Sequence, residues 1–177
     1  MRLALYQPDI PQNAGTLMRA AACLGIPVDV IEPAGFDTSD RNLRRAGLDY
    51  LAHLDLTRHV SFAAFEAWRH AAGHRLVLAS TRADRPYTDH AFRQSDILLV
   101  GRESAGVPER VHAAADARLR IPMRPGMRSL NVAVAAAMIL GEALRQIGPG
   151  RTEPGRAEPG QAEPGQAGPQ ATAEVGR

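Results

Sequence analysis

Short apolar runs alternate with longer amphipathic stretches over the first 147 residues of the chain. The apolar runs predict strands at residues 2–6, 28–31, 54–59, 76–79, 97–100 and 117–121. Between them, apolar residues at helical spacing predict helices at residues 13–24, 39–46, 61–71, 109–115 and 130–146. This alternation is typical of a mostly parallel sheet with helices on both faces. We therefore predict one doubly wound α/β domain over residues 1–147.

From Gly148 onward the sequence changes to a degenerate five-residue repeat of Glu, Pro, Gly and Ala. Such a repeat has no apolar face to bury, proline removes backbone donors and glycine adds chain entropy. We predict that residues 148–177 form a disordered tail. A solvated appendage is the favoured interpretation of this tail, and a partner-binding role stays open.

The composition fits a folded domain, because 45% of the 177 residues are hydrophobic and can bury a substantial core. The chain has no run of about eighteen uncharged apolar residues and no basic segment followed by an apolar signal region. We expect a cytoplasmic protein without a membrane partner. The single cysteine excludes an internal disulfide, and the apolar run around Cys23 predicts buried packing rather than a nucleophile.

All 21 basic residues are arginine, and the formal net charge is +2. Arginine suits phosphate groups, so one interpretation is a surface that binds RNA. The other is a genomic preference for arginine codons, which the abundance of Ala, Gly and Pro favours. A small net charge does not by itself indicate nucleic-acid binding, so local clusters of arginine are the better guide.

Polar residues follow three of the predicted strands, at the sheet edge where ligands bind in open α/β folds. After the first strand, Asn13 is the expected N-cap of a helix and Arg19 follows one to two turns later. After the fifth strand, Glu103 is the only carboxylate of the segment GRESAGVP. After the sixth, a loop with two prolines closes on Ser129, the expected N-cap of the last helix, and Asn131. Taken singly, each of these polar residues is explained by an ordinary helix cap or glycine turn. Their convergence at one edge of the sheet predicts a site for polar or anionic groups.

Two other kinds of site are disfavoured by residue spacing. The glycines of GRESAGVP do not have the spacing of a dinucleotide-binding loop or a P-loop, although Glu32 does follow the second strand. His70 and His74 are separated by the helix-breaking Gly73 and have no third ligand nearby in sequence. We therefore expect neither a dinucleotide-dependent oxidoreductase nor a metal site.

The three polar segments together resemble the motifs of the SPOUT-class RNA ribose 2'-O-methyltransferases. The resemblance is carried by Asn13 and Arg19, by GRESAGVP, and by IPMRPGMRSLN before an alanine-rich helix, in this order over nearly all of residues 1–147. The short length and the segments LYQPDIPQNAG, IEPAGF and LRRAGLDY are similar to the small branch of this class that methylates the wobble nucleotide of tRNA.

This resemblance implies a fold and a cofactor that the pattern of residues does not predict. The fold would be an α/β knot, a deep trefoil in which the C-terminal helix threads an earlier loop, although knots are rare in proteins. The protein would be a homodimer whose subunits share each site, and it would hold S-adenosylmethionine in a bent conformation. The cofactor would lie against the loop after the fourth strand and against the two later motifs, at Ala79, Ser80, Gly101, Ile121, Met123, Ser129 and Leu130.

The implied reaction transfers a methyl group from S-adenosylmethionine to the ribose 2'-OH of the wobble nucleotide, a cytidine or modified uridine, of tRNA, with leucine isoacceptors as the expected substrates. Because arginine stays protonated, we expect Arg19 to activate the hydroxyl together with a substrate phosphate rather than to accept the proton. The remaining motif residues, Asn13, Glu103, Ser129 and Asn131, would orient the substrate and the loops.

RNA contact is expected at Arg41, Arg44 and Arg45, on a short predicted helix, with Tyr50 and Phe36 as the nearest aromatic residues for stacking. The expected partner is the anticodon stem-loop of tRNA, recognised by shape and phosphates. Two alternatives stay open. One is the same chemistry on ribosomal RNA or another tRNA site, and the other is a non-catalytic RNA-binding relative.

Overall fold

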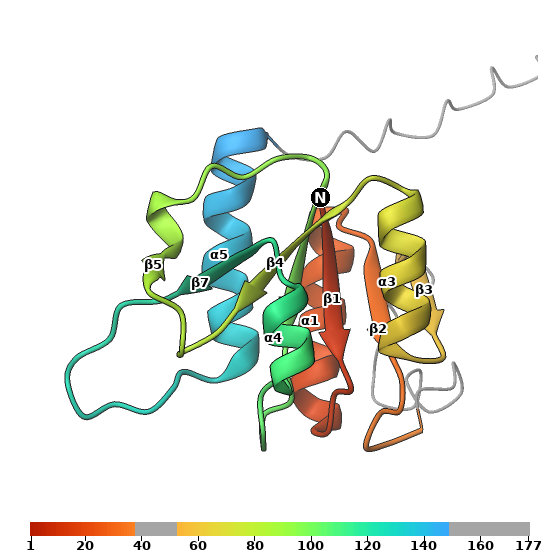
Figure 1. Cartoon of the computed structure of the whole chain (residues 1–177), viewed down its shortest axis with the longest axis horizontal. Coiled ribbons are helices and arrows are strands. Elements are labelled where there is room, and N and C mark those ends of the chain that lie inside the picture. The colour runs from red at the N-terminus through yellow and green to blue at the C-terminus, as the bar shows by residue number, and fades with distance from the viewer. Residues whose placement is uncertain (38–52, 149–177) are drawn as a thin grey trace, which may run out of the picture.

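The computed structural model describes residues 1–37 and 53–148, which form one parallel sheet covered by helices (Figure 1). Seven strands lie in the order β3-β2-β1-β6-β4-β7-β5, and every strand pairing is parallel. The strands are β1 (Arg2–Tyr6), β2 (Val28–Ile31), β3 (Leu56–His59), β4 (Arg75–Ala79), β5 (Arg85–Pro86), β6 (Asp96–Val100) and β7 (Ala117–Arg120). The helices are α1 (Pro11–Leu24), α3 (Phe62–Ala71), the 3-10 helix η2 (Tyr87–Asp89), α4 (Glu109–Ala114) and α5 (Val132–Ile147).

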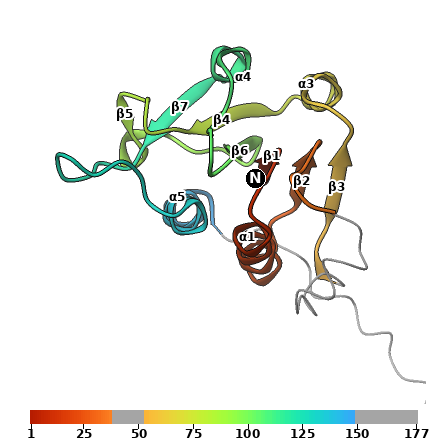
Figure 2. The ribbon, with the colours of Figure 1, turned by 90° about the horizontal axis from the view of Figure 1, so that it is seen from below.

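Helices cover both faces of the sheet, as Figure 2 shows, with α1 and α5 on one face and α3 and α4 on the other. Each face has its own apolar core. The first core joins α1 and α5 to the sheet through residues such as Leu17 and Ile139, and the second joins α3 and α4 through Phe65 and Val111. The central strand β6 is buried along its whole length, which explains why its sequence reads as a continuous apolar run.

The predicted doubly wound α/β architecture is confirmed, with differences at the ends of two helices. Helix α1 begins at Pro11 with Ile10 as its N-cap, so the prediction that Asn13 is the N-cap was wrong. Proline is favoured in the first turn of a helix because its missing N–H has no partner there anyway. Helix α5 begins at Val132 with Asn131 as its N-cap, so the cap predicted at Ser129 was also wrong.

Some predicted elements shift or fall outside the structure. Strand β3 begins at Leu56 rather than at residue 54, and the short elements β5 and η2 were not predicted, because two or three residues carry no periodicity. The predicted helix 39–46 and nearly all of the predicted tail 148–177 lie outside the described residues. The division into a domain and a disordered tail therefore stays a prediction, as does the knot.

The position of Cys23 corrects another prediction. Its side chain is exposed, whereas the buried residues of α1 are Ala14, Leu17, Met18 and Ala21. These four residues recur at the three- and four-residue spacing of a single helix face, and Cys23 falls on a different face. None of the described helices is long and apolar enough to cross a membrane.

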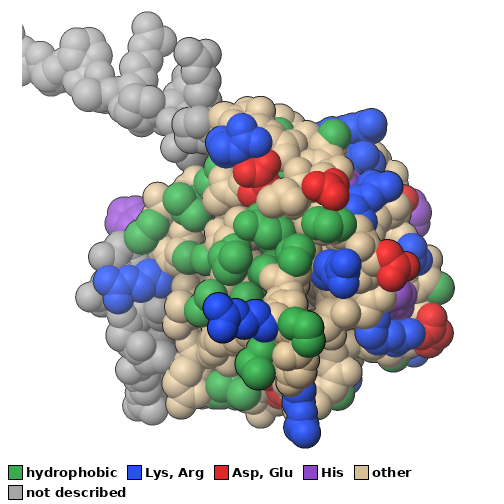
Figure 3. All heavy atoms as spheres, turned by 90° about the vertical axis from the view of Figure 1, so that its left-hand side faces the viewer, with side chains coloured by type: hydrophobic (Ala, Val, Ile, Leu, Met, Phe, Trp, Pro, Cys, Tyr) green, Lys and Arg blue, Asp and Glu red, His purple; other side chains and the backbone are tan. Residues whose placement is uncertain are grey.

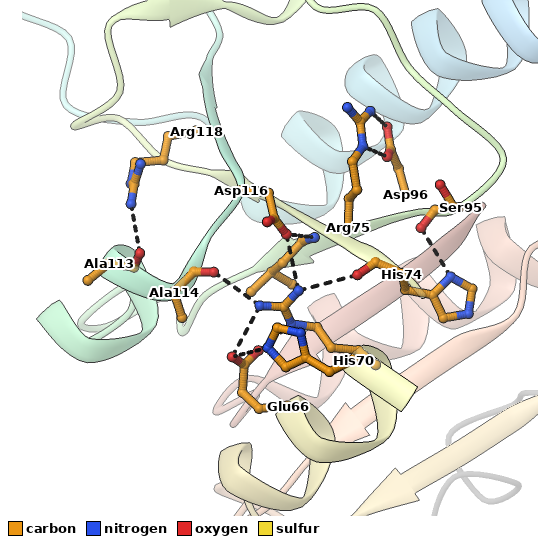
Figure 4. Close-up of polar contacts among 12 residues, drawn as sticks. Glu66, His70, His74, Arg75, Ser95, Asp96, Ala113, Ala114, Asp116 and Arg118 are labelled. Atoms are coloured by element: carbon orange, nitrogen blue, oxygen red, sulfur yellow. Dashed lines mark hydrogen bonds and ion pairs between the residues drawn. The ribbon is translucent and has the colours of Figure 1, made fainter. Parts of the chain in front are cut away.

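Arginine–carboxylate contacts hold the amino ends of the strands together, as the close-up in Figure 4 shows. Arg75, the first residue of β4, makes a bidentate pair with the fully buried Asp96, the first residue of β6, at 2.7 and 2.8 Å. Arg69, which is 2% exposed, contacts Glu66 and donates to Asp116 at 3.1 Å and to two backbone carbonyls. This edge of the sheet is thus stabilised by buried ionic contacts with satisfied donors.

Candidate functional site

A pocket of about 610 Å³ lies at the opposite edge, where β4, β6 and β7 end. Three loops and the start of α5 line it, so segments far apart in the sequence meet there. It contains all of the predicted cofactor-binding residues and four of the five predicted catalytic residues, namely Asn13, Ala79, Ser80, Gly101, Glu103, Ile121, Met123, Ser129, Leu130 and Asn131. The convergence that the sequence analysis predicted for these loops is therefore present in the structure.

The loop after β6 closes tightly on itself at the floor of this pocket. The backbones of Arg102 and Gly106 exchange hydrogen bonds of 3.1 and 2.8 Å. A Cβ atom at Gly101 would lie 2.7 Å from the carbonyl carbon of Gly106, which no real side chain tolerates. Gly106 itself has a φ of +63°, a conformation that glycine adopts without strain. The two glycines are therefore needed for the shape of the loop.

Asp9, in the loop after β1, holds the loop after β6 in place. One of its carboxylate oxygens accepts a hydrogen bond from the backbone N–H of Glu103 at 3.0 Å, and the other accepts from the N–H of Ser104 at 3.3 Å and from its hydroxyl. Next to this contact, the guanidinium of Arg102 donates to Gln7 and lies over the ring of Tyr6 at 5.9 Å. Sequence reasoning missed Asp9, and the available signal was an acidic residue three positions after the end of a strand.

The Glu103 carboxyl occupies a partly buried position against Asp9. Burial raises the pKa of Glu103, and hydrogen bonding to Asp9 raises it further. The same hydrogen bond from Glu103, with those from Ser104, holds the pKa of Asp9 well below its usual range. Oε2 of Glu103 is buried without a hydrogen-bond partner among the described residues. Glu103 also lines the pocket, so this unused acceptor belongs to a residue that borders the space open to a ligand.

Asn131 joins the start of α5 to α1. Its side-chain oxygen caps the helix by accepting from the N–H groups of Ala133 at 2.9 Å and Val134 at 3.3 Å. Its amide nitrogen donates to the side-chain oxygen of Asn13 at 3.0 Å. The cap occupies donors that the sequence analysis had left free for an anion. The pairing of Asn13 with Asn131 shows how the first and third motifs meet.

Arg19 is the one predicted catalytic residue that does not line the pocket. It is exposed on α1, six residues after Asn13, which does line the pocket. Six residues turn an α-helix through about 600°, so the two side chains leave the helix roughly 120° apart. The expectation that both face the pocket is therefore wrong for a single chain.

The predicted RNA-binding residues are only partly visible. Arg41, Arg44, Arg45 and Tyr50 lie outside the described residues. Phe36 is half-buried and its side chain packs against the apolar core, which does not favour the stacking role predicted for it. The arginine cluster therefore stays a prediction.

The two histidines considered for metal binding have separate partners. Nε2 of His70 lies 3.6 Å from a carboxylate oxygen of Glu66, whereas Nδ1 of His74 lies 3.0 Å from the carbonyl oxygen of Ser95 (Figure 4). Within residues 1–37 and 53–148, no group of three or more His, Cys, Asp or Glu side chains is placed to hold a metal ion.

The fold and the pocket define a class of protein. The SpoU rRNA Methylase family matches residues 1–141, and the chain belongs to this family. Among its relatives, a tRNA (cytidine(34)-2'-O)-methyltransferase of Beijerinckia indica is 70% identical over 146 residues, which are 82% of this chain and 91% of the relative. The protein of the same name from Escherichia coli K12 is 37% identical over 153 residues, 85% of this chain and 96% of its own.

Solved structures agree with this assignment. A structure described as giving structural insights into the 2-OH methylation of C/U34 on tRNA has 48% identity and a TM-score of 0.76, and the match covers 82% of this chain and 94% of that one. The SpoU methyltransferase AviRb of Streptomyces viridochromogenes, in complex with AdoMet, has 33% identity and a TM-score of 0.74. That match covers 82% of this chain and 60% of the AviRb chain.

Proposed function

We propose that this chain transfers a methyl group from S-adenosylmethionine to the ribose 2'-OH of nucleotide 34, the wobble nucleotide, of tRNA. The observation that carries the proposal is the 70% identity, over 91% of its length, to a relative named for methylation of cytidine 34. The pocket supports it, because the polar residues of all three motifs meet there. A cytoplasmic location is part of this proposal.

The residues of the pocket fit S-adenosylmethionine, the cofactor present in the AviRb complex. The pocket volume of about 610 Å³ lies in the range of sites for ligands of this size. Gly101 and Gly106 let the loop after β6 fold back on itself, which shapes the wall of the pocket that this loop forms. The cofactor supplies a methyl group on a positively charged sulfur. Ala79, Gly101, Ile121, Met123, Ser129 and Leu130 would hold the cofactor.

The remaining motif residues would act on the ribose. Glu103 would accept a hydrogen bond from the substrate, since it lines the pocket and its Oε2 has no hydrogen-bond partner among the described residues. The Asn13–Asn131 pair would fix the position of α5 next to the reacting groups. Arg19 would activate the 2'-OH together with a phosphate of the RNA, because the guanidinium group of arginine matches phosphate in charge and geometry.

The position of Arg19 supports a homodimer with shared sites. Since Arg19 does not line the pocket of its own chain, we propose that it acts at the pocket of the partner subunit. Helices α1 and α5 pack side by side, and α5 exposes Val134 at 51% and Met138 at 39%. Leu24 of α1 is 41% exposed. These three exposed apolar side chains favour an interface in which a second copy of the chain buries them.

The proposed knot is supported by contacts of the C-terminal end of α5. The side chain of Gln146 accepts a hydrogen bond from the N–H of Phe92 and donates to the carbonyl of His90, both at 3.0 Å. The Gln94 side chain donates to the carbonyl of Ile147 at 3.3 Å. The end of α5 is thus fastened to the segment between β5 and β6, as expected if α5 passes through an earlier loop.

The test of the proposed function is methyl transfer from labelled S-adenosylmethionine to total tRNA from a strain that lacks the homologous gene. Mapping should place a 2'-O-methyl group on nucleotide 34, with leucine isoacceptors as the expected substrates. Transfer of the labelled methyl group to ribosomal RNA alone would support the proposed reaction but reject tRNA as its substrate. No transfer to either RNA would favour a non-catalytic RNA-binding protein. In the same assay, Arg19→Ala should abolish transfer while cofactor binding remains, because Arg19 lies outside the pocket.

A further inference from the structure

Three arginines of the segment from β7 to α5 have no electrostatic partner within residues 1–37 and 53–148. The side chains of Arg120, Arg124 and Arg128 are exposed and make no hydrogen bond or ion pair with any residue in the described part of the chain. Other arginines of this protein do have carboxylate partners, since Arg69 is paired with the partly buried Glu66 and Arg75 with the buried Asp96. The three arginines are therefore available for an anionic ligand.

A tight turn fixes two of these arginines close together. The carbonyl of Arg124 accepts a hydrogen bond from the N–H of Met127 at 3.2 Å, Pro125 holds the second position, and Gly126 has a φ of +86°. Proline and a positive-φ glycine in these positions are typical of a type II turn, which brings its first and fourth Cα atoms within about 7 Å. Arg124 is the first residue of the turn, and Arg128 follows its fourth residue, Met127. The two arginines are thus held near one another before any ligand binds.

The same segment borders the pocket. Arg120 and Arg128 line the pocket, and Arg124 lies on the turn beside it. Met127, within the turn, is 64% exposed. Figure 3 views the side of the molecule that carries this loop and shows apolar side chains gathered there with arginines around them. Cations at the mouth of a pocket raise the local concentration of an anionic substrate.

We propose that Arg120, Arg124 and Arg128 bind the backbone phosphates of the RNA on either side of the nucleotide that enters the pocket. This inference rests on the proposed function and adds the surface that positions the RNA. Arginine matches phosphate in geometry and charge, and phosphate contacts fix the register of a protein on its nucleic acid. The exposed apolar surface of Met127 next to the guanidinium groups provides a place for an unstacked base. The carboxylate of the cofactor is the other anion that reaches this pocket.

The experiment compares Arg124→Gln and the double variant Arg124→Gln, Arg128→Gln with Arg93→Gln. Arg93 is a matched control, because it is also exposed without an ion pair to any described residue but lies just before β6, at the opposite edge of the sheet. Binding of tRNA is measured from 50 to 200 mM salt, and binding of S-adenosylmethionine is measured separately by calorimetry.

Each arginine removed should lower the slope of log K against log salt by about 1 and weaken tRNA binding roughly fivefold at 0.1 M salt. Arg93→Gln should match the wild type, and Arg124→Gln should bind the cofactor as the wild type does. The proposal is overturned if both variants bind tRNA as the control does, or if the double variant loses only cofactor binding, which would assign Arg128 to the cofactor carboxylate. Salt-dependent tRNA binding that falls in the variants, without methylation by the wild type, would reject the proposed function and keep this inference.

Discussion

Two groups of three arginines, one at each edge of the sheet, differ in their partners. At the amino ends of the strands, Arg2, Arg69 and Arg75 each contact a carboxylate, and two of those carboxylates, Asp29 and Asp96, are fully buried. At the carboxyl ends, Arg120, Arg124 and Arg128 have no such partner among the described residues.

The two edges also differ in what their carboxylates contact. Asp9 is bonded to the backbone of the loop after β6 and to Glu103 rather than to an arginine. Asp9 and the three arginines thus remain available to a ligand at the carboxyl edge, whereas Arg2, Arg69 and Arg75 at the amino edge are neutralised by carboxylates. The comparison teaches that the arginine content of the chain has no single explanation. At the amino edge arginine stabilises the fold through ion pairs, and at the carboxyl edge it serves the proposed binding of RNA.

The largest expected effect is on stability at the amino edge. Replacing the buried Arg69 with Ala leaves Glu66 and Asp116 without their partner and removes two bonds to backbone carbonyls. Each carbonyl left unsatisfied costs about 1–3 kcal/mol, so the free energy of unfolding should fall by about 2–6 kcal/mol. Urea unfolding should show this loss, with activity per folded molecule unchanged. Arg124→Ala, at the other edge, should change stability by about 0.5 kcal/mol or less. Equal losses in the two variants would contradict the comparison.

The next effect is on turnover at the carboxyl edge. Gly101→Ala introduces a Cβ atom 2.7 Å from the Gly106 backbone, so the loop after β6 must move. A displacement of about 1 Å at a site of reaction lowers kcat/KM on the order of a hundredfold. The measurement is steady-state methyl transfer, with circular dichroism to confirm that the variant is folded. Full activity would show that the loop tolerates the shift and that its closed shape is not required.

A further prediction concerns the subunit contact. Met138→Glu places a charge on the exposed apolar face of α5 and should convert the proposed dimer to a monomer in sedimentation analysis. Val60→Glu is the control, since Val60 is 83% exposed and precedes α3 on the other face of the sheet. A wild-type protein that sediments as a monomer would remove the proposed role of Arg19 across the interface.

The smallest effect is a change in the pH dependence of stability. The raised pKa of Glu103 means that the folded state favours its neutral form, so stability is lost as pH rises through that pKa. Glu103→Gln keeps a neutral side chain at every pH. The variant should therefore gain stability relative to the wild type between pH 4 and pH 8, measured by urea unfolding. A difference that is constant with pH would show that Glu103 is not held in its neutral form.

Much of this fold was predictable because apolar periodicity reports burial. The run at β6 and the three- and four-residue spacing of Leu17 and Ala21 on α1 are examples. The helix caps were less predictable, since Ser129 and Asn131 are both good cap residues and only the observed backbone chooses between them. Cys23 was misplaced because its neighbours are apolar on all sides in sequence, which hides the face that it occupies.

The candidate site also has parts that the sequence predicts and parts that it does not. The loops that meet at the pocket follow from the edge rule for parallel sheets together with a family resemblance. Asp9 was missed because its role depends on contacts with Glu103 and Ser104, more than ninety positions later in the chain. Arg19 could not be placed by sequence, since its distance from the pocket depends on where α1 starts and how it is turned.

The most direct test of the two-edge account is hydrogen–deuterium exchange of the protein alone, with S-adenosylmethionine, and with S-adenosylmethionine and tRNA. We expect the cofactor to protect residues 101–108 and 121–131, and tRNA to extend protection over the turn at Arg124 to Arg128. Exchange at the amino edge, in residues 69–75 and 112–116, should stay unchanged. Protection of the amino edge by tRNA, with none at the loop between β7 and α5, would contradict the account.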